Sequence, residues 1–448
     1  MTGDKERFRR RRRAVGPGMR RAKIFQIISA VSFFLGILAS DRVSSGAWPQ
    51  SANGRTAAQT TVAGKNGRAP KPKTFPRSEY LRDEACAPCH REIFESYEQT
   101  AHHLTSQIAN KETIVGTFSP GANTMPTANP RLFFRMDEKD GEFFQTAVWK
   151  QADSLNAGTI ATAGSEGRTH TERLDLVIGS GGKGQTYLYW RDNQLFQLPA
   201  GYSTVLHRWI NSPGYEDGLA DFERAIIPRC LECHATYFEA AFPDPEINIY
   251  DPKTFELGIS CGRCHGPERG HAKNHTSTNA VARPDGIVNP RKLSRRRQAD
   301  VCAQCHGGQG DRELMPAFTY TPGQPLENYI DLGPLDSSKD IDVHGKQGKL
   351  LEKSRCYEMS QNLNCSTCHD VHQKEPGLEA MSQHCLACHK VQPSATHAKV
   401  GEGIIKNCID CHMPSLESKV VYLNVDGKKV RPRFRSHWIR IYSPDELQ

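Results

Sequence analysis

The string Cys-x-x-Cys-His occurs seven times in this 448-residue chain, and it constrains the fold more than any other feature. The two thiols lie one helical turn apart, so they can bond to both vinyl groups of one porphyrin, and the adjacent imidazole can then bind its iron. The repeats therefore predict seven covalently attached c-type haems. The predicted thioether cysteines are Cys86, Cys89, Cys230, Cys233, Cys261, Cys264, Cys302, Cys305, Cys365, Cys368, Cys385, Cys388, Cys408 and Cys411. The predicted proximal ligands are His90, His234, His265, His306, His369, His389 and His412, and we number the motifs 1 to 7 in this order.

Two other uses of cysteine explain the pattern less well. Structural zinc sites combine Cys-x-x-Cys pairs into tetrahedral sites, but zinc gives no reason for a histidine directly after every second cysteine. A disulfide framework leaves the histidines unexplained as well. We therefore prefer haem to both alternatives.

The N-terminal part has the pattern of an export leader. A dense basic run from Arg7 to Arg13 precedes an apolar stretch from Ile24 to Ala39. Residues 1–47 are predicted to be a signal peptide or an N-terminal anchor, and cleavage after Ala47 is favoured because 16 apolar residues are short for a membrane span. Residues 48–79 lack an apolar period and are predicted to be a disordered linker.

The basic balance of the whole chain comes from this leader. Residues 1–47 contain eleven Lys or Arg and three Asp or Glu, a net charge equal to the +8 of the full chain. Residues 48–448 carry no net formal charge. Haem propionates would therefore make the loaded protein acidic. The composition therefore gives no support to nucleic-acid binding.

The haem motifs divide the rest of the chain. We predict a first haem segment at 80–109, a β-rich insert at 110–225 and a six-haem cytochrome domain at 226–448. Aromatic and β-branched runs on either side of Asp140-Gly141 predict a hairpin in the insert. The glycine string at 179–184 is interpreted as a hairpin connection and not as a phosphate loop.

After Cys230 the sequence predicts short helices and turns with few apolar residues for a core. Haem faces would supply the missing apolar surface, so the stability of this part should depend on haem attachment. The predicted fold class is a mainly α multihaem cytochrome c scaffold with little regular secondary structure, plus the β-rich insert between motifs 1 and 2.

Histidines outside the motifs are candidates for the second axial position of each iron. A second histidine gives a low-spin iron of relatively low potential. The preferred distal ligands are His102, His271, His344, His372, His384, His397 and His437, with His103 and His275 as alternates to His102 and His271. His170 and His207, in or beside the insert, are interpreted as structural, and Met413 as a packing residue.

Two further features have an open interpretation. Cys356 is the one cysteine outside the motifs, and a buried thiol is favoured over a redox or ligand role. A cationic cluster, Arg291, Lys292 and Arg295 to Arg297, could dock an acidic redox partner, but neutralisation of haem propionates is favoured.

The phrases around motifs 3, 5 and 7, with His271 and His372 following two of them, resemble the multihaem cytochrome c superfamily that includes the cytochrome c554 type. The segment from Tyr97 to Thr105 is similar as well. The resemblance covers residues 80–105 and 226–440, and it implies an exported, mostly helical scaffold that holds haems in close stacked or perpendicular pairs. The superfamily also contains nitrite reductases and hydroxylamine oxidoreductases that use one haem with an open distal face.

These observations predict an exported heptahaem cytochrome that transfers electrons through closely packed, mostly bis-histidine haems. Its expected partners are a quinol-side donor or another cytochrome, and its expected place is the periplasm or another extracytoplasmic site, with attachment to the inner membrane through the N-terminus as an option. The alternative is an oxidoreductase acting on a small nitrogen or sulfur compound at one five-coordinate haem. A weaker hypothesis makes the insert a docking module.

Overall fold

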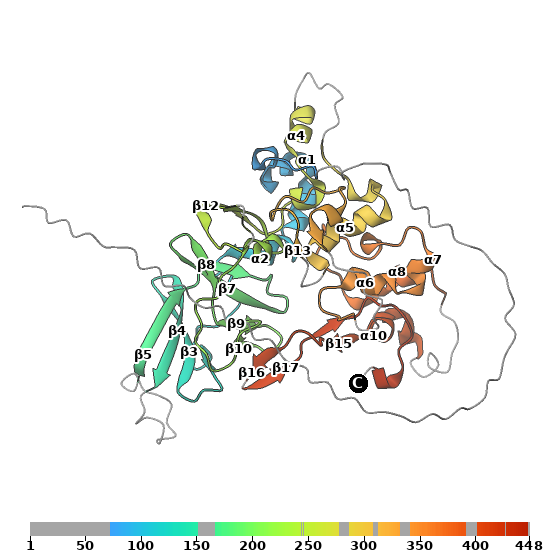
Figure 1. Ribbon diagram of the computed structural model, residues 1–448. Coiled ribbons are helices and arrows are strands. Elements are labelled where there is room, and N and C mark those ends of the chain that lie inside the picture. The colour runs from blue at the N-terminus through green and yellow to red at the C-terminus, as the bar shows by residue number, and fades with distance from the viewer. Residues whose placement is uncertain are drawn as a thin grey trace, which may run out of the picture. The chain divides into compact units, whose positions relative to one another are not determined.

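Antiparallel sheets dominate the segment between the first two haem motifs in the computed structural model (Figure 1). The structure describes residues 72–150, 166–242, 244, 246–276, 286–307, 312–331, 341–390, 401–425 and 427–446. The predicted leader and most of the predicted linker therefore lie outside the described residues. Contacts group residues 68–448 into one unit.

A four-stranded sheet forms the first half of the insert, in the order β2-β3-β4-β5. Its strands are β2 Thr124–Pro126, β3 Leu132–Lys139, β4 Glu142–Lys150 and β5 Glu166–Arg173. Leu132, Phe134 and Met136 of β3 are buried while the residues between them are half-exposed, as the period of two of a strand requires. Asp140 and Gly141 both have positive φ, which is the geometry of a tight hairpin turn.

The second sheet of the insert has six strands. They are β1 Ser106–Ile108, β6 Leu176–Ile178, β7 Gly184–Arg191, β8 Gln194–Gln197, β9 Ala200–Ser203 and β10 Arg208–Asn211. The glycine string at 179–184 connects β6 to β7, as predicted for a hairpin connection.

The core of the insert lies between these two sheets. Trp209, Phe134 and Tyr187 are almost fully buried in one cluster. The buried side chain of Gln145 on β4 accepts a hydrogen bond from the backbone N–H of Ala200 on β9 at 2.9 Å and donates to the Ala200 carbonyl at 3.0 Å. A buried amide with both hydrogen-bonding groups satisfied fixes how the sheets pack together.

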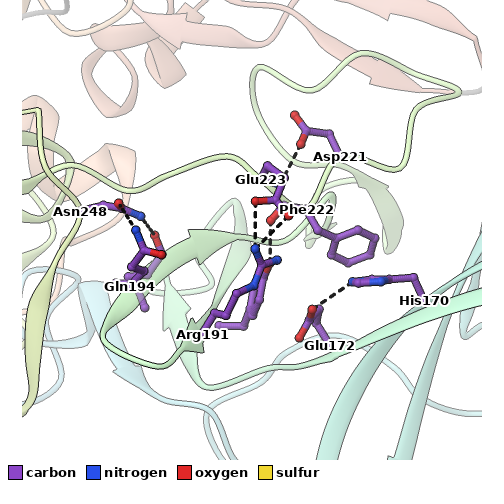
Figure 2. Close-up of polar contacts among 10 residues, drawn as sticks. His170, Glu172, Arg191, Gln194, Asp221, Phe222, Glu223 and Asn248 are labelled. Carbon is purple, nitrogen blue, oxygen red and sulfur yellow. Dashed lines mark hydrogen bonds and ion pairs between the residues drawn. The ribbon is translucent and has the colours of Figure 1, made fainter. Parts of the chain in front are cut away.

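The outer surface of the insert carries paired polar groups (Figure 2). Arg191 donates from one nitrogen to both carboxylate oxygens of Glu223 at 2.9 Å, and His170 pairs with Glu172 at 2.9 Å. The His170 ring also packs 4.4 Å from the Phe222 ring. These contacts give His170 a place in the structure of the insert.

The remaining described chain combines short helices with two-stranded hairpins. The helices are α1 Ala87–Tyr97, α2 Pro228–Glu232, α3 Gly262–His265, α4 Arg269–Thr276, α5 Arg295–His306, α6 Gln347–Glu352, α7 Arg355–Met359, α8 Leu378–Leu386 and α10 Ile409–His412. The 3₁₀ helices are η1 Arg77–Glu79, η2 Asp83–Ala85, η3 His103–Thr105, η5 Pro290–Lys292, η6 Leu326–Asn328, η7 Cys365–Thr367, η8 Gly401–Lys406 and η9 Pro444–Glu446. The paired strands are β11 Ala235–Ala240 with β12 Tyr250–Leu257, β13 Arg312–Glu313 with β14 Ile330–Asp331, β15 Ser415–Glu417 with β18 Arg433–Arg435, and β16 Leu423–Val425 with β17 Lys428–Val430.

The predicted mainly α fold class is wrong. Helices and strands each account for 27% of the structure, and antiparallel sheets are numerous. The physical reason is local, because most haem motifs form a single turn or a short helix, so they add little helix. Hairpins also occur after Cys230, where the sequence predicted only helices and turns. Within the described ranges, none of the helices combines the length and the apolar content that crossing a membrane requires.

Candidate haem centres

The predicted haem motifs fold into helical turns. In motif 1 the His90 N–H donates to the Cys86 carbonyl at 2.9 Å, and motifs 3, 5, 6 and 7 repeat this bond at 2.9–3.0 Å. Motif 4 ends the longer helix α5, whereas the His234 N–H of motif 2 bonds to Leu231. Such a turn brings the two cysteines and the histidine of a motif to one side of the backbone, as attachment to one porphyrin requires.

Four of the predicted proximal histidines each face a predicted distal histidine. Two imidazoles bound to one metal from opposite sides at about 2 Å have ring centres about 6 Å apart. The ring centres are 6.4 Å apart for His90 and His271, 6.2 Å for His306 and His102, 6.0 Å for His265 and His372, and 6.0 Å for His369 and His437. These separations fit an iron between the two rings of each pair.

The Nδ1 atom of several predicted ligand histidines already has a hydrogen-bonding partner. His265 Nδ1 lies 2.8 Å from the Val288 carbonyl oxygen, His412 Nδ1 lies 3.0 Å from that of Arg440, and His437 Nδ1 lies 2.8 Å from Gln347 Oε1. His369 Nδ1 lies 3.1 Å from a carboxylate oxygen of Glu375. A hydrogen bond at Nδ1 fixes the tautomer and presents Nε2 to a metal, as in most histidine-ligated sites.

Burial favours the neutral form of five candidate ligand histidines. It lowers the pKa of His102, His234, His265 and His306, and neighbouring imidazoles lower it further. Burial, followed by the nearby His369, lowers the pKa of His437 to about 4. A neutral imidazole is the form that binds iron, so the protein holds these rings ready for coordination near neutral pH.

The imidazole pairs connect different motifs. His271 follows motif 3 and faces the histidine of motif 1, while His372 follows motif 5 and faces the histidine of motif 3. His102 follows motif 1 and faces the histidine of motif 4. Motif 2 lies beside motif 4, since Cys233 Sγ is 3.8 Å from the Gln304 carbonyl oxygen and Cys305 Sγ is 3.9 Å from that of Glu232. Motifs 1 to 5 therefore form one contiguous group.

The other distal candidates do not form such pairs. His344 packs against the Phe434 ring at 5.0 Å, and its buried Nδ1 has no hydrogen-bond partner within the part of the chain that the structure describes. His384 is exposed on α8, and His397 lies outside the described residues. Of the alternates, His275 contacts the His271 ring at 4.5 Å, and His103 meets the Tyr97 ring edge-on. His207 occupies the turn between β9 and β10 with positive φ.

Tyr97 is a site residue to which sequence reasoning gave no role. Its ring is buried on α1, 6.4 Å from the His372 ring, and its hydroxyl donates to the Ile259 carbonyl. The Tyr97 ring therefore packs against the His372 ring. An aromatic residue seven positions after motif 1 has no spacing signal that points to this contact.

The cationic cluster at 291–297 is partly paired within the chain. Arg295 donates to the carbonyls of Tyr357 and Ser360, and Arg296 and Arg297 contact Glu327. Arg297 also pairs with Asp300. Three of the five side chains are thus engaged by the protein itself.

Cys356 is half-buried on α7, and burial raises the pKa of its thiol. A thiol with a raised pKa is a weak nucleophile, which agrees with a packing role.

Part of the chain matches a known protein family, and its fold is similar to one solved structure. A family model described as "Cytochrome c554 and c-prime" matches residues 214–266, which contain motifs 2 and 3. The chain is similar to the crystal structure of the outer cell wall cytochrome OcwA, with a TM-score of 0.50, 17% sequence identity and coverage of 82% of this chain and 81% of that one. A search of curated proteins gave no match.

Residues 214–266 thus match a cytochrome family, and the fold of the chain is similar to that of a cell-wall cytochrome. The family match lies over motifs 2 and 3, the part of the chain where the sequence predicts two covalently attached haems. Haem supplies an iron that cycles between ferric and ferrous forms. At 17% sequence identity the likeness to OcwA shows the fold alone.

Proposed function

We propose that this cytochrome transfers electrons through seven covalently attached haems. The observation that carries the proposal is the set of four imidazole pairs with ring centres 6.0–6.4 Å apart. Two imidazoles on one iron give a low-spin centre that exchanges electrons without binding a substrate. His344, His384 and His397 are the proposed ligands left for the irons of motifs 2, 6 and 7.

The links between motifs support rapid transfer along the chain of haems. The pairs connect motif 1 to motif 3, motif 3 to motif 5 and motif 4 to motif 1. The contacts of Cys233 with the Gln304 carbonyl and of Cys305 with the Glu232 carbonyl bring motif 2 beside motif 4. Porphyrins attached to such neighbouring turns lie close together, as an electron relay requires.

The proposed location is outside the cytoplasm. The leader pattern at residues 1–47 supports export, and the similar structure is that of an outer cell wall cytochrome. Other redox proteins are the proposed partners, with a quinol-side donor or another cytochrome as the specific candidates. Attachment to the inner membrane through the N-terminus rests on the apolar stretch alone.

A second candidate function is reduction or oxidation of a small nitrogen or sulfur compound at one five-coordinate haem. The surroundings of motifs 2, 6 and 7 favour this function. No described imidazole faces His234, His389 or His412 in the way that a distal histidine faces the proximal histidine of each of the other four motifs. An open iron could bind substrate directly, and a nearby Arg or His would supply charge and protons.

Electron paramagnetic resonance of the oxidised, fully loaded protein separates the two functions. The proposed relay predicts low-spin ferric signals that integrate to seven irons, with no high-spin signal. A high-spin signal equal to one iron would contradict seven six-coordinate haems and support the oxidoreductase.

A further inference from the structure

We propose that residues 415–435, here called the C-terminal ridge, dock an acidic redox protein that exchanges electrons with the haem of motif 7. The ridge contains β15, β16, β17 and β18 and follows motif 7 directly in the chain. This inference rests on the proposed electron-transfer function and names the partner class for it.

The ridge concentrates positive charge in an otherwise balanced chain. It contains six Lys or Arg residues and two acidic residues, whereas residues 48–448 contain equal numbers of both. Arg433 pairs with Glu417 and Arg435 pairs with Asp410. Arg431 donates to the Ser418 carbonyl at 3.0 Å. Lys428 and Lys429 are exposed and form no ion pair with any described carboxylate, so their charge is available to a partner.

Apolar side chains lie among these cations. Val420 is 63% exposed, Tyr422 38% and Val430 42%. Lys429 lies over the Tyr422 ring at 4.3 Å. An apolar patch mixed with charges is typical of a protein interface, whereas a polyanion such as a cell-wall polymer needs only the cations. The mixture therefore favours an acidic protein.

The ridge is bonded to the predicted ligand turn of motif 7. Arg435 donates to the Met413 carbonyl at 2.8 Å, directly after His412. Past the end of the ridge, the Arg440 carbonyl oxygen lies 3.0 Å from His412 Nδ1, and Cys411 is exposed. A partner seated on the ridge would therefore lie beside an exposed haem attachment site.

The ridge is also held in place before any partner binds. The buried Asn424 side chain donates to the Tyr215 carbonyl at 2.7 Å, and the Gly427 N–H donates to the Asp217 carboxylate at 2.8 Å. Ser418 bonds to Asp342 at 2.9 Å. A preformed surface loses little conformational entropy on docking, which favours fast association.

The test measures how fast the loaded, full-length protein takes electrons from two donors. The acidic protein donor is flavodoxin hydroquinone, and the small neutral donor is photoreduced lumiflavin. In each step one electron leaves the reduced flavin and converts one ferric haem to ferrous. The variant is Lys428→Glu/Lys429→Glu, and the control is Lys111→Glu/Lys139→Glu, which changes the net charge equally at exposed positions of the insert.

We expect the ridge variant to react with flavodoxin about tenfold more slowly than the unchanged protein at low salt, with the difference lost at high salt. The control should retain the unchanged rate, and all three proteins should react equally with lumiflavin. Equal flavodoxin rates for the ridge variant and the unchanged protein, or an equal loss in the control, would overturn the docking site. If lumiflavin fails to reduce the haems of any protein, the electron-transfer function itself fails.

Discussion

The insert and the C-terminal haem segment, residues 341–446, differ in how many apolar side chains they bury. The insert has one cluster of sixteen buried apolar side chains, all between Ile114 and Phe222. Residues 341–446, which include three haem motifs, bury only Val343, Leu350, Leu351, Ile409 and Tyr442 among their described apolar side chains. The insert therefore resembles an ordinary β domain, and we propose that porphyrin faces complete the core of the haem segment.

One chain can therefore combine two ways of burying apolar surface. Side-chain burial stabilises the insert at about 25 cal/mol per Å² of apolar surface, whatever the state of the haems. In the haem segment we expect the same apolar contribution to come from the bound cofactor. Four predictions test this contrast.

Production of the full chain without haem attachment should have the largest effect. Residues 341–446 should lose protection from hydrogen exchange, whereas the strands of the insert should keep theirs. Exchange measured by mass spectrometry on loaded and haem-free protein gives the comparison. Equal protection of residues 341–446 in both forms would show that haem is not part of their core.

Trp209→Ala should destabilise the insert and leave the haem segment intact. Trp209 is 1% exposed and contacts Tyr187, Tyr202 and Phe118 in the insert core. Loss of this side chain should destabilise the insert by about 3–5 kcal/mol, while the Soret band of the haems stays unchanged.

Denaturant unfolding followed by tryptophan fluorescence and by haem absorption measures both regions in this variant. The control is Ile441→Ala, since that side chain is 83% exposed and should change stability by less than about 0.5 kcal/mol. A matching loss of haem absorption in Trp209→Ala would contradict separate stabilisation.

Glu268 should make the haem region sensitive to pH. Burial raises the pKa of its carboxyl to about 7, and the Leu81 N–H donates to it at 3.1 Å. The folded state thus prefers the protonated acid, so its contribution to stability is lost as the pH rises from about 4.5 to 7. Glu268→Gln should be about as stable as the unchanged protein at pH 4.5 and about 3 kcal/mol more stable at pH 8.

Denaturant titrations at both pH values measure this effect. Glu138→Gln, at an exposed position of β3, is the matched control and should show no such gain. The same stability difference for Glu268→Gln at both pH values would contradict the raised pKa.

His372→Ala should change the spin state of one haem iron and leave the other six unchanged. Loss of the imidazole opposite His265 should convert one iron of seven from low spin to high spin, as measured by electron paramagnetic resonance. His170→Ala, which removes a histidine paired to Glu172 in the insert, should leave the spectrum unchanged. An unaltered spectrum in His372→Ala would remove His372 from the ligand set.

Sequence reasoning located the strands of the insert more accurately than the fold of the haem region. The turn at Asp140-Gly141 and the alternation in β3 are local signals, so the hairpin could be predicted. The hairpins after motif 2 depend on contacts that no local period reports. For example, Phe238 of β11 stacks on Phe255 of β12, and the strands show register shifts.

The candidate site was partly predictable for the same reason. Cys-x-x-Cys-His is a local signal, whereas the partner of each proximal histidine is set by the tertiary fold. His437 faces His369 across 68 positions of the chain, and only the structure pairs them. Tyr97 and the C-terminal ridge gave no recognisable pattern, because their contacts involve residues far apart in sequence.

Intact mass spectrometry of the exported protein tests the central claim of seven thioether-bound haems most directly. We expect a mass that exceeds that of the polypeptide by seven haem units, and this excess should remain after denaturation. A mass equal to the bare polypeptide, or a smaller number of haems on fully loaded protein, would contradict it.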